Sequence, residues 1–129
     1  MRYLLDTQVL LWLFVRSQAV DPHVRAVLAD PANLVYASAV STWEIAVKAA
    51  LGKVELPGNL GHYVPDRIAR AGLTVLPIVP AHTLGVLALP AHHRDPFDRL
   101  LVAQAQAEAM ILVTNDRIFE EYDVMRLMT

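Results

Sequence analysis

The chain has 129 residues, of which 55% are hydrophobic, and its formal net charge at pH 7 is −2. This length suits one domain with a substantial core, and the absence of cysteine excludes disulfides, thiolate catalysis and cysteine-ligated zinc. A slightly acidic chain is not a basic nucleic-acid coat, so contact with phosphates would need a local basic patch or a bound cation. The high apolar content favours a partner or a second subunit that covers part of the surface.

The first residues, MRYLLDTQVLLWLFVRSQA, have the outline of a signal peptide, with an early arginine, an apolar run and then small residues. However, Asp6 interrupts the apolar run and Arg16 ends it. The uninterrupted part, residues 9–15, is far shorter than the ~20 residues that a membrane helix needs. We therefore expect a mature, soluble protein with no membrane contact, and the lack of cysteine suits the cytoplasm.

Short β-rich apolar stretches alternate with longer helical ones along the whole chain. The predicted strands are residues 3–5, 34–36, 73–78, 111–113 and 124–128. The predicted helices are residues 9–15, 22–29, 41–52, 61–71, 81–89 and 96–109, with a helical turn at 117–121. Because the strands are continuous apolar runs, both of their faces should be buried. The pattern predicts a single α/β domain over residues 1–129, with a mostly parallel sheet of about five strands and helices on both faces.

Four acidic residues are placed to meet at one side of that sheet. Asp6 directly follows the first strand and Asp116 follows the fourth, while Glu44 and Asp98 fall in the first turns of the helices at 41–52 and 96–109. Functional groups of such sheets collect beyond the carboxyl ends of the strands. We therefore expect the four carboxylates to lie close together.

Helix capping is the competing interpretation of these acids. Glu44 fits a capping box with Ser41, Asp95 fits an N-cap before Pro96, and Asp116 fits a cap for the turn that follows it. The position of Asp98 is also favoured by the helix dipole. Capping alone explains each of these residues when it is considered singly.

Asp6 is the residue that capping explains least well, although it could cap the helix that begins near Gln8. It lies between two apolar segments, where a lone carboxylate is costly to bury unless it is paired or binds a cation. Nearby arginines or a divalent metal would neutralise it. Ligation by carboxylates alone suits Mg²⁺ or Mn²⁺, and such sites hydrolyse or transfer phosphate esters.

Four segments of the chain resemble the signatures of PIN-domain ribonucleases, and most closely those of the VapC-type toxins of bacterial type II toxin–antitoxin pairs. They are LLDTQVLLW, SAVSTWEIAVK, HRDPFDRLLVAQA and LVTNDRIF. They occur in the family's order and spacing over nearly the whole chain. The resemblance implies an endoribonuclease that depends on Mg²⁺ or Mn²⁺ and leaves 5′-phosphate and 3′-hydroxyl ends. Together with the apolar composition, it also implies a VapB-like antitoxin partner and a homodimer.

The resemblance assigns the four family acids, which would hold the metal and perform catalysis, to Asp6, Glu44, Asp98 and Asp116. Supporting polar positions near the site match Thr7, Ser41, Asp95, Thr114 and Asn115. Basic residues close to the acids in sequence either contact RNA phosphates or pair with the carboxylates, and both interpretations stay open. They are Lys48, Arg94, Arg99 and Arg117.

Three other functions compete with the metal-dependent nuclease. His92 and His93 would allow RNA cleavage without metal, by imidazole acid–base catalysis. A phosphatase-like phosphotransfer domain would use Asp6 as its nucleophile, but Gln8 stands where the haloacid-dehalogenase pattern has a second aspartate. A non-catalytic binding module would use the acids only as caps.

Overall fold

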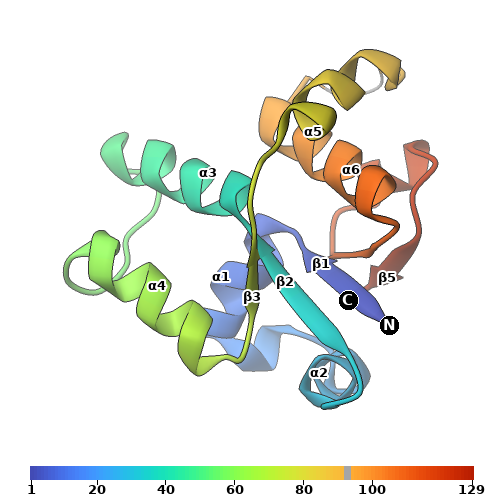
Figure 1. Ribbon diagram of the computed structural model, residues 1–129. Helices are drawn as coiled ribbons and strands as arrows, with labels where there is room; N and C mark the ends of the chain where they lie inside the picture. Colours follow the sequence, from blue (N-terminus) through green and yellow to red (C-terminus); the bar gives the residue numbers. More distant parts are fainter. Residues whose placement is uncertain (92–93) are drawn as a thin grey trace.

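The computed structural model describes residues 1–91 and 94–129, which form a five-stranded parallel sheet with helices around it (Figure 1). The strands are β1 (Arg2–Leu5), β2 (Leu34–Ser38), β3 (Thr74–Leu76), β4 (Ile111–Thr114) and β5 (Arg126–Met128). Their order in the sheet is β3-β2-β1-β4-β5, so β1 is central. The five predicted strands and the predicted α/β class are confirmed, although β3 and β5 are shorter than expected.

The helices also lie close to where the sequence predicts them, although the first begins two residues earlier and the predicted helix at 81–89 is divided between a short α-helix and a 3₁₀ turn. They are α1 (Thr7–Val15), α2 (Pro22–Ala29), α3 (Ala39–Ala50), α4 (Leu60–Arg70), α5 (Pro80–Gly85) and α6 (Pro96–Glu108), with the 3₁₀ turns η1 (Ser17–Ala19), η2 (Val86–Ala88) and η3 (Arg117–Glu121). In the part of the chain that the structure describes, no helix is long and apolar enough to span a membrane.

The sheet separates two hydrophobic cores, because neighbouring residues of a strand point to opposite faces. Leu4 of β1 packs into the core formed with α6 and η3, while Leu5 packs into the core formed with α1, α2 and α4. Both leucines are fully buried. This arrangement explains why the strands read as continuous apolar runs. Helix α3 contributes to both cores, through Val40 and Ile45.

The start of α3 differs from the prediction. Strand β2 continues into α3 with no loop between them, and Ser38, the last residue of the strand, is the N-cap. Its hydroxyl accepts a hydrogen bond from the Val40 N–H at 2.9 Å. The predicted capping box of Ser41 and Glu44 is therefore wrong, and Glu44 lies in the second turn rather than the first. The end of the helix is as predicted, with Gly52 at a φ of +73°, which favours glycine.

Candidate active site

A cavity of about 780 Å³ opens at the carboxyl ends of the central strands, and its walls come from four parts of the chain. Asp6 follows β1, Glu44 comes from α3, Asp98 from α6, and Asp116 follows β4. The structure thus brings together the four acids that the sequence singled out. Thr7, Asp95 and Asn115 line the same cavity, and Ser41 and Thr114 are buried beside it.

Asp6 is held firmly at the end of the central strand. Its backbone N–H donates to the Val113 carbonyl at 2.9 Å, which extends the pairing of β1 with β4. One carboxylate oxygen accepts from the Val9 N–H at 2.8 Å, so Asp6 caps α1, and the other accepts from the Thr114 hydroxyl. The side chain is therefore fixed by both neighbouring elements.

Burial raises the pKa of Asp6 from 3.8 to about 6. The hydrogen bonds from Thr114 and Val9 oppose this shift, and the negative charges of Asp98 and Asp116 add to it. A carboxylate in this environment is stabilised by a cation, because a positive charge offsets both its desolvation and the repulsion between the acids.

Asp116 is linked to Asp6 through Thr114. The Asp116 N–H donates to the Thr114 hydroxyl oxygen at 3.0 Å, and the same hydroxyl donates to Asp6. The Asp116 carboxylate accepts from the Ile118 N–H at 3.0 Å and caps η3. The predicted cap is therefore confirmed, and it is compatible with a place in the cavity wall.

Glu44 is buried, and its two carboxylate oxygens have different surroundings. Oε2 forms an ion pair with Lys48 one turn further along α3. Oε1 is buried and has no hydrogen-bond partner among the described residues. An acceptor buried in this way is unfavourable, so Oε1 is suited to a water, a substrate proton or a cation.

Lys48 is a cation of the cavity wall that is in direct contact with one of the acids, Glu44. Its hydrogen bond with Glu44 raises its pKa, as do the negative charges of Glu44, Asp95 and Asp98, against the opposing effect of partial burial. The ion-pair interpretation of Lys48 is therefore correct for the free protein.

Asp95 and Asp98 have different roles at the start of α6. Asp95 Oδ1 accepts from the backbone N–H groups of Phe97 at 2.9 Å and of Asp98 at 3.2 Å, and Pro96 occupies the first helical position. The predicted N-cap is thus confirmed. Asp98 lies in the first turn and lines the cavity.

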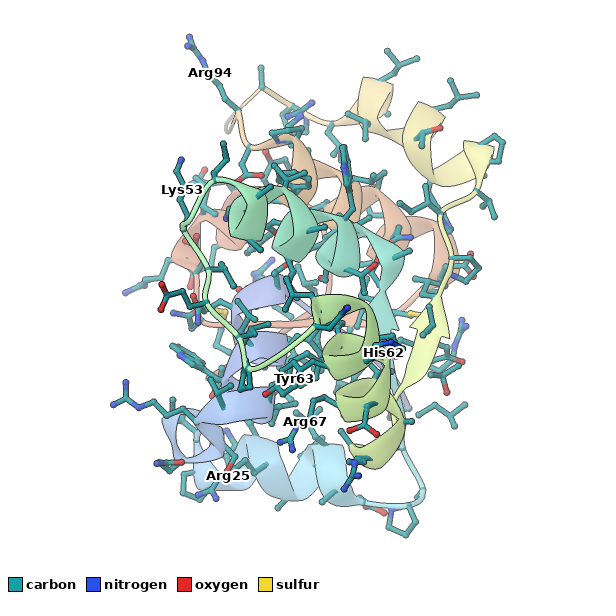
Figure 2. All side chains as sticks on the ribbon, turned by 90° about the vertical axis from the view of Figure 1, so that its left-hand side faces the viewer. Arg25, Lys53, His62, Tyr63, Arg67 and Arg94 are labelled. Atoms are coloured by element: carbon teal, nitrogen blue, oxygen red, sulfur yellow. The ribbon has the colours of Figure 1, made fainter. Side chains whose placement is uncertain are left out.

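The remaining basic candidates are spread around the site. The Arg99 guanidinium donates to the Pro90 carbonyl at 2.7 Å and approaches Tyr122, and it is not among the described residues that line the cavity. Arg117 lines the cavity and lies 3.6 Å from Glu120. Figure 2 shows Arg94 extending away from the protein body.

Lys53, on the loop after α3, also lines the cavity and was missed in the sequence (Figure 2). His92 and His93, on which the metal-independent mechanism depends, lie outside the described residues.

The acids line one cavity without forming a finished metal site. Within residues 1–91 and 94–129, no three side chains of aspartate, glutamate or histidine stand close enough together to hold an ion as they are placed. The donor set nevertheless fits a hard cation, since it consists of carboxylate oxygens. Glu44 Oε1 and Asp6 are the two groups that a cation would stabilise most directly.

The family model of the PIN domain matches residues 3–125, nearly the whole chain. This chain belongs to the PIN domain family. Over 59 residues this PIN domain is 44% identical to "Ribonuclease VapC16" of Mycobacterium tuberculosis. That alignment covers 46% of the chain and 42% of the relative, so the match extends over less than half the length of that protein.

Solved structures show the same fold. One is a chain in the complex of VapBC2 from Rickettsia felis with a DNA fragment from its promoter, with a TM-score of 0.75 and 18% identity over 98% of both chains. Another belongs to the DNA-bound VapBC of Salmonella typhimurium, with a TM-score of 0.74 and 20% identity over 98% of this chain and 96% of the other. The predicted PIN fold and the predicted similarity to VapC proteins are confirmed.

Proposed function

We propose that this PIN domain is a metal-dependent endoribonuclease that hydrolyses phosphodiester bonds of RNA in the cytoplasm, as the toxin of a toxin–antitoxin pair. The observation that carries the proposal is the cavity in which Asp6, Glu44, Asp98 and Asp116 meet from four separate elements. The name of the M. tuberculosis relative supports the same activity.

Asp6, Asp98 and Asp116 would hold Mg²⁺ or Mn²⁺, and Glu44, the fourth acid, would add its negative charge to the site. These residues offer only carboxylate oxygens, which are the ligands that both cations prefer. A bound ion would polarise the phosphate and lower the pKa of a bound water. The raised pKa of Asp6 supports this assignment, because it reflects burial next to two other negative charges.

Glu44 would accept the proton of the attacking water at Oε1. Lys48 holds Oε2, so Oε1 is the oxygen left to act as a base. With that water as the nucleophile, rather than the ribose 2′-hydroxyl, the bond between phosphorus and the 3′ oxygen breaks. The leaving oxygen takes up a proton, and the products carry a 5′-phosphate and a 3′-hydroxyl. Lys53 and Arg117 on the cavity wall, and Arg94 beyond it, would contact neighbouring phosphates.

An end-mapped cleavage assay tests the function. We expect the purified protein, freed of partners, to cleave RNA with Mg²⁺ or Mn²⁺, to stop in EDTA, and to leave 5′-phosphates. Asp6→Asn, which keeps the shape and removes the charge, should be inactive under the same conditions.

Each rival function predicts another result in that assay, or in monoester hydrolysis and Mn²⁺ binding measured beside it. Cleavage that persists in EDTA would indicate acid–base catalysis by His92 and His93 without a metal. Activity on phosphate monoesters alone would indicate the phosphatase-like domain. No cleavage and no Mn²⁺ binding would indicate that the acids serve only as helix caps and that the protein is a non-catalytic binding module.

We also propose a VapB-like antitoxin as the partner, supported by the similarity to chains of VapBC complexes. The acidic cavity would take an arginine of the partner. Beside it, an apolar groove of about 340 Å³ lies between α3 and α4 and would take apolar side chains. The groove is lined by Thr42, Ile45, Ala46, Leu60, Gly61, Val64, Pro65, Ile68 and Val75.

We also propose a homodimer. The exposed side chains of Leu84 and Leu87 would offer a second copy an apolar surface on α5 and η2. Light scattering of the free protein tests this homodimer.

Ala46→Glu is the variant that separates partner binding from catalysis. Ala46 is exposed on α3 and lines the groove, so a glutamate there would bury an unpaired charge under the partner. We expect inhibition by a VapB protein of the same genome to weaken on the order of 100-fold, with RNA cleavage by the free variant unchanged. Equal inhibition of both proteins would show that the partner docks elsewhere.

A further inference from the structure

Behind the acidic cavity, a chain of buried side-chain hydrogen bonds joins α3, α6 and α5. Ser38, His82 and Gln104 are each at most 1% exposed. The Ser38 hydroxyl bonds to Gln104 Oε1, and Gln104 Nε2 approaches both the Pro77 carbonyl at 3.2 Å and His82 Nδ1 at 3.3 Å. His82 Nε2 lies 2.9 Å from Glu108 Oε1. None of these residues is among the described residues that line the acidic cavity.

The donors and acceptors of this chain run in one direction. A carbonyl only accepts, so the Pro77 contact identifies the Gln104 amide nitrogen and leaves its oxygen to accept from Ser38. The Val79 N–H only donates, so His82 Nδ1 is an acceptor and its Nε2–H donates to Glu108. Gln104 thus has a matched partner for its oxygen and for its nitrogen.

The Ser38–Gln104 bond also sets the register between α3 and α6. Further along the pair, the rings of Trp43 and Phe97 pack with their centroids 4.6 Å apart. From the first contact to the second, the residue number increases on α3 (38 to 43) and decreases on α6 (104 to 97). The two helices therefore pack antiparallel. Their mutual packing is thereby fixed at two points.

Two of the acids lie at equal steps from this bond. Glu44 is six residues after Ser38, and Asp98 is six residues before Gln104. Both lie ~9 Å along their helices from the bond, at 1.5 Å per residue. A slip of α3 against α6 would therefore change the separation of the two carboxylates directly.

A second buried bond connects α3 to the helix that follows Asp6. The Thr7 hydroxyl donates to the Ser41 hydroxyl oxygen at 2.9 Å. The elements that bear Asp6, Glu44 and Asp98 are thus joined to one another by hydrogen bonds between buried side chains.

We propose that Gln104 is a positioning residue of the acidic site, which acts through Ser38 to hold α3 and α6 in the register that brings Glu44 and Asp98 to one cavity. This inference rests on the proposed function, because positioning matters only if the acids bind a metal together. Gln104 bonds to Ser38, Pro77 and His82, so it acts through the helices and not by direct contact with a metal ligand. Loss of a residue that hydrogen-bonds a ligand directly weakens metal binding about 10–100-fold, so we expect an effect at the lower end of that range.

Gln104→Met tests the proposal, because methionine has a similar length and suits a buried site but forms neither bond. The readouts are the Kd for Mn²⁺ alone, followed by electron paramagnetic resonance, and the unfolding midpoint of the metal-free protein. We expect Mn²⁺ to bind at least about 10-fold more weakly to the folded variant. Val24→Ala is the control for lost stability, because it creates a cavity in the core on the other face of the sheet. This variant should bind Mn²⁺ as tightly as the parent protein.

Ser38 supplies a second route to the same test. Ser38→Ala should weaken Mn²⁺ binding to a similar extent, whereas Ser38→Thr should bind Mn²⁺ normally because it keeps a hydroxyl. The double variant Ser38→Ala/Gln104→Met should bind Mn²⁺ little more weakly than Gln104→Met alone, because both substitutions break the same hydrogen bond. Normal Mn²⁺ binding by Gln104→Met, or by Ser38→Ala if the former does not fold, overturns the positioning role and leaves the nuclease proposal intact. No Mn²⁺ binding by the parent protein overturns both.

Discussion

Asp98→Asn is expected to reduce RNA cleavage by at least about 100-fold, because a direct ligand should matter at least as much as the residues that orient it. Asp95→Asn, three residues earlier, should reduce cleavage only a few-fold. Asparagine is as good an N-cap as aspartate, and its side-chain oxygen would still accept from the Phe97 and Asp98 N–H groups. The two substitutions remove the same charge from the same end of α6.

The pair is compared by initial cleavage rates at saturating Mn²⁺, with thermal unfolding measured alongside to confirm that both variants are folded. Equal losses for the two variants would mean that the negative charge at the start of α6 matters and the identity of the ligand does not. Full cleavage activity of Asp98→Asn would show that Asp98 is not a metal ligand.

Asp6→Asn is expected to stabilise the metal-free protein at pH 8 by about 3 kcal/mol while it abolishes cleavage. The pKa of Asp6 rises from 3.8 to about 6 in the folded protein, and that difference corresponds to about 3 kcal/mol against the charged form. Asparagine imitates the neutral carboxyl. Its oxygen would keep the hydrogen bond from Val9, and its amide nitrogen would donate to the Thr114 hydroxyl oxygen instead of accepting from it. The substitution therefore removes an unfavourable charge with little change in shape.

The pH dependence has a definite sign. Because the folded pKa is raised, stability from protonated Asp6 is fully present below about pH 4 and is lost as the pH rises through about 6. The difference between variant and parent should thus be small at pH 4 and complete above pH 6. Denaturant unfolding without metal from pH 4 to pH 8 measures it, with the exposed Asp123→Asn as the charge control. A parent protein more stable than Asp6→Asn at pH 8 would contradict the prediction.

The fold could be predicted from the sequence largely because both faces of the sheet are buried. Leu4 and Leu5 pack into different cores, and such strands appear as uninterrupted apolar runs. The start of α3 could not be predicted, because Ser41 and Glu44 match a capping box as well as Ser38 matches an N-cap. The strand runs directly into the helix, and only the three-dimensional pairing of β2 shows where it ends.

The site was predictable where it depends on local order, since Asp6 directly follows β1 and Asp116 lies two residues after the end of β4. The pairing of Glu44 with Lys48 has a local signal as well, because the two are four residues apart on one helix. Gln104 is different. A polar residue within the apolar run LLVAQA indicates burial with a partner, but that partner is 66 positions away in the chain.

The central position of β1 has a consequence for how the protein matures during synthesis. The hydroxyl that bonds to Asp6 belongs to Thr114, 108 positions later, and Asp116 follows two residues further on. At about 5–20 residues per second on the ribosome, several seconds separate the emergence of the first acid from that of the last. A nascent chain therefore lacks a complete cavity until β4 has emerged and paired beside β1. The interval would delay the onset of the proposed nuclease activity and would give the proposed antitoxin time to meet the new chain.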